Sequence, residues 1–440
     1  MSIFVQVLMA FGSVLVLLGL MAVVRKLAKS VGLSAEVQRK LVHIGTGLYA
    51  LTLPWLFPAR WPVYMLIATT LVVMAVLRLP RFSKTGLGAT LHTIDRRSYG
   101  DFLLALSIGI CFLLAQGNLL QYVLPIAVLT LADAAAALAG TVYGTKRFKV
   151  EESHKSVEGS AVFFAVTLVI SLICLLLLAD LPPLNVLALS LMIAAFGTLV
   201  EAQSWRGFDN LFLPLGLLIF LAVHGDSTLP QLAVLAGLFA LSLAGFRYLG
   251  PGLGLNAHTG RVYVVVVFLL LAVTAVQNAA LPVLVLVAHA WCRMSTPCNE
   301  KYPDLDVAAS LALFSFGWLA LGNATGWNAI SFYGLSAMGL TMGLCVLALP
   351  PVRMRFFGSL AIAAALFGVH QGVVSVNPSN ANWAGPMVGP SLVVLGLVAA
   401  ATTAIPCFFD NDRVMKLTLL ALAVPLGYYG FALMQMEKPF

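Results

Sequence analysis

The stretch LLQYVLPIAVLTLADAAAALAG, residues 119–140, decides the fold. It is 22 residues long and contains one charged side chain, that of Asp133. About 20 consecutive apolar residues are enough for a helix to cross the hydrocarbon core of a membrane. The stretch therefore predicts a membrane-spanning helix with one ionisable group about two turns inside it. An ionisable group at that depth is costly unless it faces a polar cavity, a cation or a partner, so Asp133 indicates function.

The composition of the whole chain agrees with this reading. Of its 440 residues, 61% are hydrophobic and 10% are charged, and the mean hydropathy is +0.99. These values exclude a water-soluble globular protein and a disordered one. The six cysteines form neither a CxxC pair nor a cluster with histidine, so we interpret them as small apolar residues.

Similar apolar segments recur along the chain, and together they predict an all-α polytopic membrane bundle of about 16 transmembrane helices. The segments run approximately over 3–24, 43–57, 61–79, 101–116, 119–140, 158–179, 184–203, 211–223, 229–246, 262–276, 280–292, 306–323, 328–349, 356–373, 387–405 and 416–434.

The basic residues predict the orientation of this bundle. With the N-terminus outside, 23 of the 25 Lys and Arg residues fall on one side, and only Arg60 and Lys438 fall on the other. Cationic loops prefer the cytoplasmic side of a membrane. The net charge of +8 is then explained by orientation, and we expect no nucleic-acid partner. We expect an integral protein of a bacterial inner membrane with its functional loops in the cytoplasm.

Two basic motifs lie at predicted cytoplasmic ends. In Arg39-Lys40-Leu-Val-His43, helical spacing puts Arg39 and His43 on one face and Lys40 about 100° away. This motif predicts a cationic cradle for phosphate, and a cytoplasmic anchor with an interfacial histidine is the alternative. The second motif, RRSYGD at 96–101, is also compatible with a solvated loop whose acidic residue begins a helix.

The segment that contains Asp133 continues into a glycine pair and a basic loop. Gly140 and Gly144 are four residues apart and allow a helix or a ligand to approach closely, and a plain packing face explains them equally well. The chain then re-enters the membrane at KSVEGS, residues 155–160. The cations of this region are Lys146, Arg147, Lys149 and Lys155. Carboxylates for a divalent metal, followed by ammonium groups, suit a nucleoside triphosphate.

A third acidic region follows the segment 184–203. Glu201 ends one predicted helix, and Asp209 and Asn210 begin the next, so all three can face the same cytoplasmic vestibule as Asp133. Carboxylate and amide oxygens are ligands for hard cations. Ordinary helix-end polar residues, with Asp209 as an N-cap, are the alternative.

In this order the motifs resemble the polyprenol kinase family, which includes dolichol kinase, phytol kinase and the CTP-dependent diacylglycerol kinases. The matching blocks are Arg39-Lys40-x-x-His43, Asp133-x6-Gly140-x3-Gly144, Lys155-Ser156-x-Glu158-Gly159-Ser160, and Glu201 followed by Asp209-Asn210-x3-Pro214. The third block also resembles the CDP-diacylglycerol synthases. The resemblance covers roughly residues 35–220. It implies transfer of the terminal phosphoryl group of CTP to the primary alcohol of a long isoprenoid or related membrane lipid.

The hypothesis gives each motif residue a role, with Mg²⁺ and CTP as the cofactor and the phosphoryl donor. Asp133 and Asp209 bind Mg²⁺ with help from Asn210, and Glu201 either binds metal or takes the hydroxyl proton. His43 is the second candidate for the base or for a phosphate donor, and Glu158 orients Lys155 or adds to the metal shell. The residues assigned to the nucleotide are Lys155, Lys146, Arg147, Arg39 and Lys40, with Gly140 and Gly144 close by.

The second half of the chain carries few ionisable residues in its apolar segments. We divide the chain into a kinase-like membrane domain, 1–247, and a second membrane domain of unknown role, 248–440. His289 and His370 are interpreted as packed or interfacial, and the acidic residues Glu300, Asp304 and Asp306 as solvated. The identity of the alcohol and the oligomeric state are not predicted.

Two alternative functions remain open. A cytidylyltransferase that makes a CDP-lipid would use the same groups, and its product distinguishes it from a kinase. A lipid transporter or flippase would suit sixteen spans, but the halves show no convincing similarity and the carboxylates lie toward one face.

Overall fold

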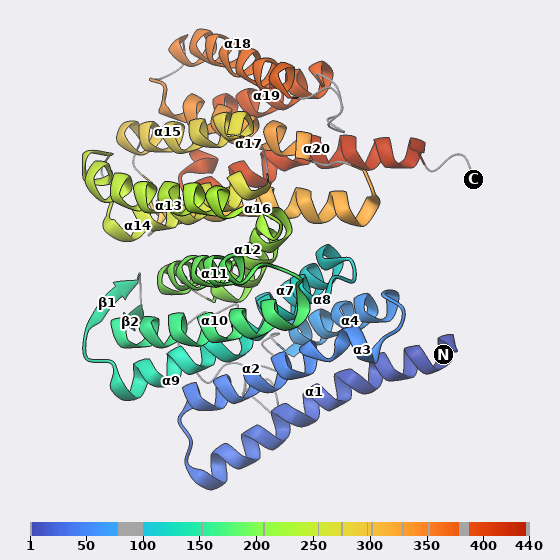
Figure 1. Ribbon diagram of the computed structural model, residues 1–440. Coiled ribbons are helices and arrows are strands. Elements are labelled where there is room, and N and C mark those ends of the chain that lie inside the picture. Colours follow the sequence, from blue (N-terminus) through green and yellow to red (C-terminus); the bar gives the residue numbers. More distant parts are fainter. Residues whose placement is uncertain are drawn as a thin grey trace. The chain divides into compact units, whose positions relative to one another are not determined.

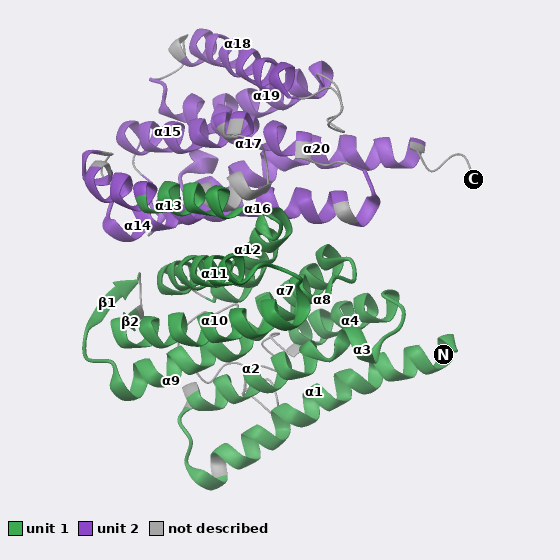
Figure 2. Ribbon diagram, in the orientation of Figure 1, with its two compact units in different colours: residues 1–240 green, residues 241–440 purple. Residues whose placement is uncertain are grey.

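A computed structural model describes residues 2–77, 100–150, 153–205, 207–253, 255–273, 276–296, 298–300, 302–327, 330–350, 353–377 and 387–436. The chain forms two compact units, residues 1–240 and residues 241–440 (Figure 2). The described residues are helical apart from one short β-hairpin, which the all-α prediction did not include.

The helices of the first unit follow the apolar segments of the sequence (Figure 1). They are α1 (Ile3–Val31), α2 (Ala35–Leu51), α3 (Leu53–Leu56), α4 (Trp61–Leu77), α7 (Gly100–Ala115), α8 (Leu119–Ala127), α9 (Asp133–Tyr143), α10 (Val157–Leu178), α11 (Pro183–Gln203), α12 (Asp209–His224) and α13 (Leu229–Leu249), the last of which continues into the second unit. Helix α10 packs against α9 and α11, and α12 packs against α7, α8 and α11.

A π-helical turn, η1 (Val128–Ala132), joins α8 to α9. Such turns are rare and occur frequently at functional sites. Helix α2 packs against this turn. The approach is close at Gly47, where a Cβ atom would lie 2.6 Å from Thr130 Cγ2 and 2.8 Å from Thr130 Cβ. Only glycine therefore lets α2 lie this near the residues that precede Asp133.

The hairpin lies between α9 and α10 and consists of β1 (Arg147–Val150) and β2 (Ser153–Ser156). The strands are antiparallel, with Phe148 opposite Lys155 and Arg147 opposite Ser156. Ser156 also caps α10, because its Oγ accepts a hydrogen bond from the backbone N–H of Gly159 at 3.0 Å. The hairpin therefore leads directly into the first turn of α10.

The second unit is helical over its described residues. Its elements are η2 (Gly250–Leu253), α14 (Ala257–Val273), η3 (Val276–Ala279), α15 (Ala280–Ser295), α16 (Pro303–Thr325), α17 (Ile330–Ala348), α18 (Arg353–Val376), α19 (Val388–Ala404), η4 (Pro406–Phe409) and α20 (Arg413–Met436). Helix α17 is the core of this unit and packs against α15, α16, α18, α19 and α20.

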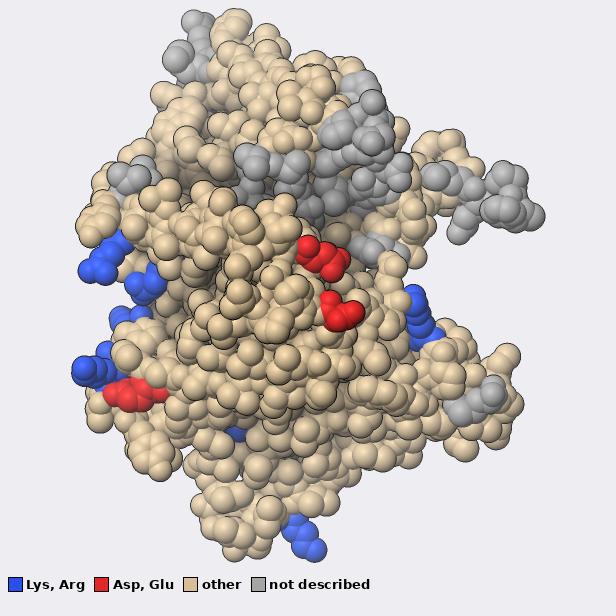
Figure 3. All heavy atoms as spheres, in the orientation of Figure 1, with Lys and Arg blue, Asp and Glu red and all other residues tan. Residues whose placement is uncertain are grey.

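Among the described residues, nine helices are long and apolar enough to cross a membrane, and five more apolar helices are shorter. Helix is found in each of the sixteen predicted segments. Many large apolar side chains are exposed, and few charged side chains are visible on the face in Figure 3. This surface suits hydrocarbon rather than water. That all sixteen segments cross, with the N-terminus outside, stays a prediction.

Candidate active site

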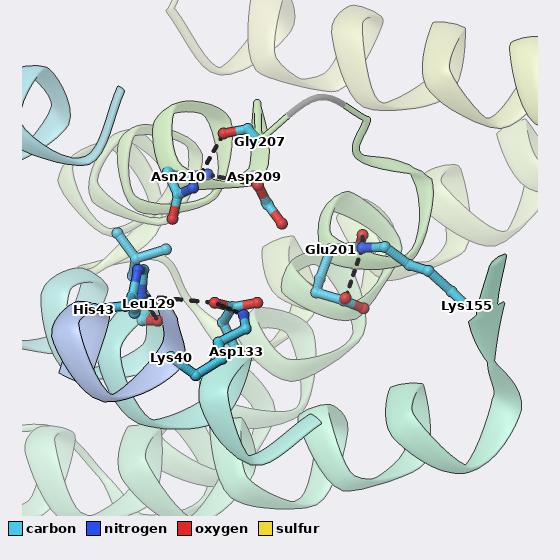
Figure 4. Close-up of polar contacts among 9 residues, drawn as sticks. All are labelled: Lys40, His43, Leu129, Asp133, Lys155, Glu201, Gly207, Asp209 and Asn210. Carbon is cyan, nitrogen blue, oxygen red and sulfur yellow. Dashed lines mark hydrogen bonds and ion pairs between the residues drawn. The ribbon is translucent and has the colours of Figure 1, made fainter. Parts of the chain in front are cut away.

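The deepest charged contact in the first unit joins α2 to α9. Lys40 Nζ donates to Asp133 Oδ2 at 2.6 Å, and each side chain is 6% exposed (Figure 4). His43 Nε2 lies 3.6 Å from the same carboxylate oxygen. Asp133 is the first residue of α9 after the π-helical turn. A buried carboxylate is therefore compensated by a buried ammonium from another helix, as a charge inside an apolar bundle requires.

His43 has a second partner in the π-helical turn. Its Nε2 lies 3.1 Å from the carbonyl oxygen of Leu129. Because a carbonyl oxygen only accepts, Nε2 must carry the proton and donate it. In the neutral ring the lone pair is then on Nδ1.

Lys40 and His43 meet the same partner, although helical spacing predicts that His43 shares a face with Arg39 and that Lys40 lies about 100° away. Both side chains reach Asp133. Residues three apart also share a helix face, and α2 begins at Ala35, so both side chains lie within its regular part. Arg39 is half-buried beside them.

A second charged pair joins β2 to the end of α11. Lys155 Nζ lies 2.6 Å from Glu201 Oε1 and also donates to the main-chain carbonyl of Glu201. Burial by itself lowers the pKa of the Lys155 ammonium, but the Glu201 carboxylate, with Asp209 and Asp133 nearby, raises it above its usual 10.5. Lys155 is therefore a permanent cation at neutral pH, and its contacts with the described residues use two of its three N–H donors.

The beginning of α12 completes the cluster. Figure 4 shows the Asp209 carboxylate pointing toward the space between the two lysine–carboxylate pairs. Asn210 donates through Nδ2 to the Gly207 carbonyl at 3.2 Å. Its own Oδ1 is buried and has no hydrogen-bond partner among the residues that the structure describes, which is unusual for a buried acceptor. The structure thus brings together Asp133, Glu201, Asp209 and Asn210 from three helices.

Glu158 is placed differently from the prediction. Its carboxylate accepts from the Thr145 hydroxyl and from the backbone N–H of Lys146 at 3.1 Å, whereas Lys155 is oriented by Glu201. Glu158 is on the first turn of α10, where it ties the chain after α9 to the start of α10. The expectation that it orients Lys155 is therefore wrong, and the alternative, a contribution to the metal shell, stays a prediction.

The other cations of the hairpin are exposed. Side chains alternate between the two faces of a strand, and directly opposed residues share a face. Lys155 therefore shares a face with Phe148, and Arg147 lies on the other face. Lys146 and Arg147 are both exposed. Their assignment to phosphate stays a prediction, and the structure does not bring Arg147 to the face of Lys155.

Gly140 and Gly144 lie against the start of α10. A Cβ atom on Gly140 would be 2.9 Å from Ser156 Oγ, and one on Gly144 would be 2.8 Å from Ser156 Cβ. Gly159 approaches α9 equally closely from the other side, because its Cβ would lie 2.9 Å from the Ala136 carbonyl oxygen. The close contact between α9 and α10 accounts for these glycines by packing, and their proximity to nucleotide stays a prediction.

Sequence reasoning missed the contributions of Leu129 and Thr145. Leu129 acts through its carbonyl group, and Thr145 through a hydroxyl in a short connection, so neither residue type stands out in the sequence. The motif at 96–101 lies outside the described residues except for Gly100 and Asp101, and Arg206 also lies outside them.

In the second unit, Asp304 was predicted to be solvated, and this prediction is wrong. It is 14% exposed, and it binds His289 Nε2 at 2.9 Å and Arg293 Nη1 at 2.5 Å. His289 and His370 are both buried, as packed residues. The acidic residue thus holds α15 to the start of α16.

These features define an integral membrane protein with a buried, charged site built from helix ends of its first unit. A phytol kinase from Synechocystis sp. (strain ATCC 27184 / PCC 6803 / Kazusa) is 32% identical to this chain over 217 residues, which cover 47% of this chain and 88% of that protein. The chain therefore belongs to the polyprenol kinase family. No family model and no solved structure matches it.

Proposed function

We propose that this protein transfers the terminal phosphoryl group of CTP to the primary alcohol of an isoprenoid lipid at the cytoplasmic face of the membrane. The observation that carries the proposal is the convergence of the Lys40–Asp133 and Lys155–Glu201 pairs with Asp209 about one space. The kinship with a phytol kinase supports an alcohol as the acceptor. The preference for CTP comes with the family resemblance.

The residues present fit a magnesium ion by their chemistry. Mg²⁺ prefers oxygen ligands, and the buried, unpartnered Oδ1 of Asn210 is an oxygen without another use in the described residues. Asp133 and Asp209 would hold the ion with Asn210. No group of three or more His, Cys, Asp or Glu side chains is arranged for a metal within the described residues. The two carboxylates would therefore need the Asn210 amide oxygen as a further ligand. When bound, the ion would neutralise phosphate charge.

The chain's own residues would align the reactants and handle the proton. The alcohol oxygen attacks the γ-phosphorus, the bond to the bridging oxygen breaks, and CDP leaves with those electrons. Lys155 binds the phosphate oxygens through its remaining N–H donor. Glu201 takes the hydroxyl proton or binds the ion, and His43 is the second candidate for the base through its Nδ1.

The test is phosphorylation by membranes that contain the protein. Membranes are incubated with γ-labelled CTP or γ-labelled ATP and, separately, with phytol, dolichol, undecaprenol or diacylglycerol. We expect label in the lipid product with CTP and an isoprenoid alcohol. A cytidylyltransferase would instead release the label in pyrophosphate. Membranes in which no alcohol and no nucleotide yields labelled lipid would contradict the kinase proposal.

A further inference from the structure

An apolar cavity lies beside the charged cluster, within the first unit. Helices α1, α2, α4 and α7 line it together with Leu53 of α3, and its empty volume is about 870 Å³ including the open solvent at its mouth. Of its 19 lining residues, 14 are apolar, and the remaining five are His43, Thr46, Tyr49, Thr70 and Asp101. On each helix the lining residues recur every three or four positions, which makes one continuous stripe per helix.

The histidine and the aspartate that line the cavity lie toward the same end of it. Arg60 at the start of α4 donates to the carbonyl of Gln116 at the end of α7, so these two helices run in opposite directions. Helix α4 also follows α2 through the short α3, which places the end of α2 near the start of α4. Asp101, the first lining residue on α7, and His43, beside the first lining residue on α2, therefore lie toward the same end of the cavity.

The rest of the described lining is apolar apart from three hydroxyl-bearing residues, Thr46, Tyr49 and Thr70, and two of these hydroxyls have partners. Thr70 donates to the Leu66 carbonyl at 2.8 Å, and the Tyr49 hydroxyl donates to Ser13. From Val42 to Ala50 the lining of α2 extends eight residues, or about 12 Å of helix. This length is roughly two fifths of the thickness of a bilayer's hydrocarbon core.

We infer that this cavity holds the hydrocarbon tail of the acceptor, an isoprenoid alcohol, with its hydroxyl at the His43 end. His43 connects the cavity to the charged cluster, since it lines the cavity and its Nε2 lies 3.6 Å from Asp133 Oδ2. A ligand with one polar end and one apolar chain matches a cavity that has His43 and Asp101 toward one end and mostly apolar residues elsewhere. The inference rests on the proposed kinase function.

Photo-crosslinking tests the location independently of catalysis. The full-length protein in membranes is irradiated with a farnesol analogue that carries a diazirine on its tail, and the adducts are mapped by mass spectrometry. We expect adducts on α1, α2, α4 or α7 that unlabelled phytol suppresses. Adducts on other helices, or suppression by diacylglycerol and not by phytol, would overturn the inference. If no alcohol is phosphorylated, the kinase proposal fails and the adducts still decide the location.

A matched pair of variants tests the same point by kinetics. Val14 lines the end of the cavity away from His43, whereas Val16, two residues along α1, is 59% exposed and does not line it. We expect Val14→Trp to raise the KM for phytol at least roughly tenfold, because several methylene groups lose their apolar contact. The KM values for CTP and for geraniol, half as long as phytol, should stay within about twofold.

Val16→Trp should leave all three constants unchanged. An unchanged KM for CTP also shows that the Val14→Trp protein is folded. Equal losses for phytol and geraniol, or no loss for either in a folded Val14→Trp protein, would place the tail elsewhere.

Discussion

Asp133 carries its charge where water does not reach it, and the Lys40 ammonium takes the place of water. We expect Asp133→Asn to reduce alcohol phosphorylation by about 10²-fold or more, as removal of a preorganised charge from an active site does. It should also lower stability by about 3–5 kcal/mol, because Lys40 is left buried without a counter-charge. Activity is measured with labelled CTP, and stability by thermal unfolding in detergent.

The double variant Asp133→Asn/Lys40→Met separates these two effects. It removes both charges, so we expect most of the stability to return while activity stays absent. Asp180→Asn, at an exposed position between α10 and α11, is the control and should behave as the wild type. Normal turnover by Asp133→Asn would exclude this carboxylate from catalysis.

Lys155 should act mainly on the nucleotide. We expect Lys155→Ala to raise the KM for CTP roughly 10- to 100-fold, since a hydrogen bond to a charged group contributes about 1.5–3 kcal/mol. Lys149→Ala, on an exposed hairpin position, should change it little. An unaltered KM for CTP in Lys155→Ala would argue against the phosphate role.

The raised pKa of Lys155 predicts how the effect of its substitution depends on pH. A lysine whose folded-state pKa lies above its unfolded value contributes stability that is present below the unfolded value and is lost only as pH rises through the folded one. Between about pH 7 and 9 Lys155 therefore stays protonated. We expect the effect of Lys155→Ala on the KM for CTP to be the same across this window.

At this scale the sequence could identify the charged residues but not their partners. Asp133 and Glu201 stand out because ionisable groups are rare within and at the ends of apolar segments. Which lysine meets which carboxylate depends on the neighbouring helices, and Lys40 lies 93 residues from Asp133. The predicted contact between Glu158 and Lys155 was wrong because it relied on their closeness in sequence, whereas the first turn of α10 directs Glu158 toward Thr145.

Among the elements, the contact of α2 with the π-helical turn holds Lys40 and His43 against Asp133. Gly47→Ala would place a methyl group against buried, β-branched Thr130, so we expect α2 to shift and activity to fall several-fold, by about 1 kcal/mol or more. Thr130→Ala in the same chain removes the two closest crowding atoms, Oγ1 and Cγ2, and should restore part of the activity. The measurement is kcat with labelled CTP.

Gly12→Ala is the control for this substitution. A Cβ atom there meets nothing within 4 Å, and the residue is in the same kind of apolar helix. Helix propensity alone then favours alanine by about 0.5–1 kcal/mol. Full activity of Gly47→Ala would show that α2 tolerates a larger distance from the turn.

Long apolar runs made the helices predictable, because burial in a membrane leaves few other ways to satisfy the backbone. The hairpin and the π-helical turn were not predictable by the same reasoning. The strands are only four residues each, and their sequence reads as a charged loop. The π-helical turn has the same apolar composition as the helix around it.

For the whole molecule, the charge distribution predicts that the hairpin is cytoplasmic and that the turn between α12 and α13 is outside. Lys149→Cys and Asp226→Cys test this at two exposed positions, in a chain whose exposed Cys407 is replaced by serine. A membrane-impermeant maleimide added to intact cells should label Asp226→Cys only. Lys149→Cys should react after the cells are lysed. Labelling of Lys149→Cys in intact cells would reverse the proposed orientation.

The cap of α10 by Ser156 also controls which hairpin side chain reaches Glu201. Neighbours along a strand face opposite ways, so a slip of one residue would bring His154 or Ser156 to the carboxylate in place of Lys155. The Ser156 hydroxyl fixes the register of β2, because Ser156 must stay at the N-cap of α10 to accept the hydrogen bond from the Gly159 backbone N–H. The start of α10 thus fixes which residue of β2 lies against Glu201. Without the Ser156 hydroxyl, a neighbouring residue of the strand could take the place of Lys155.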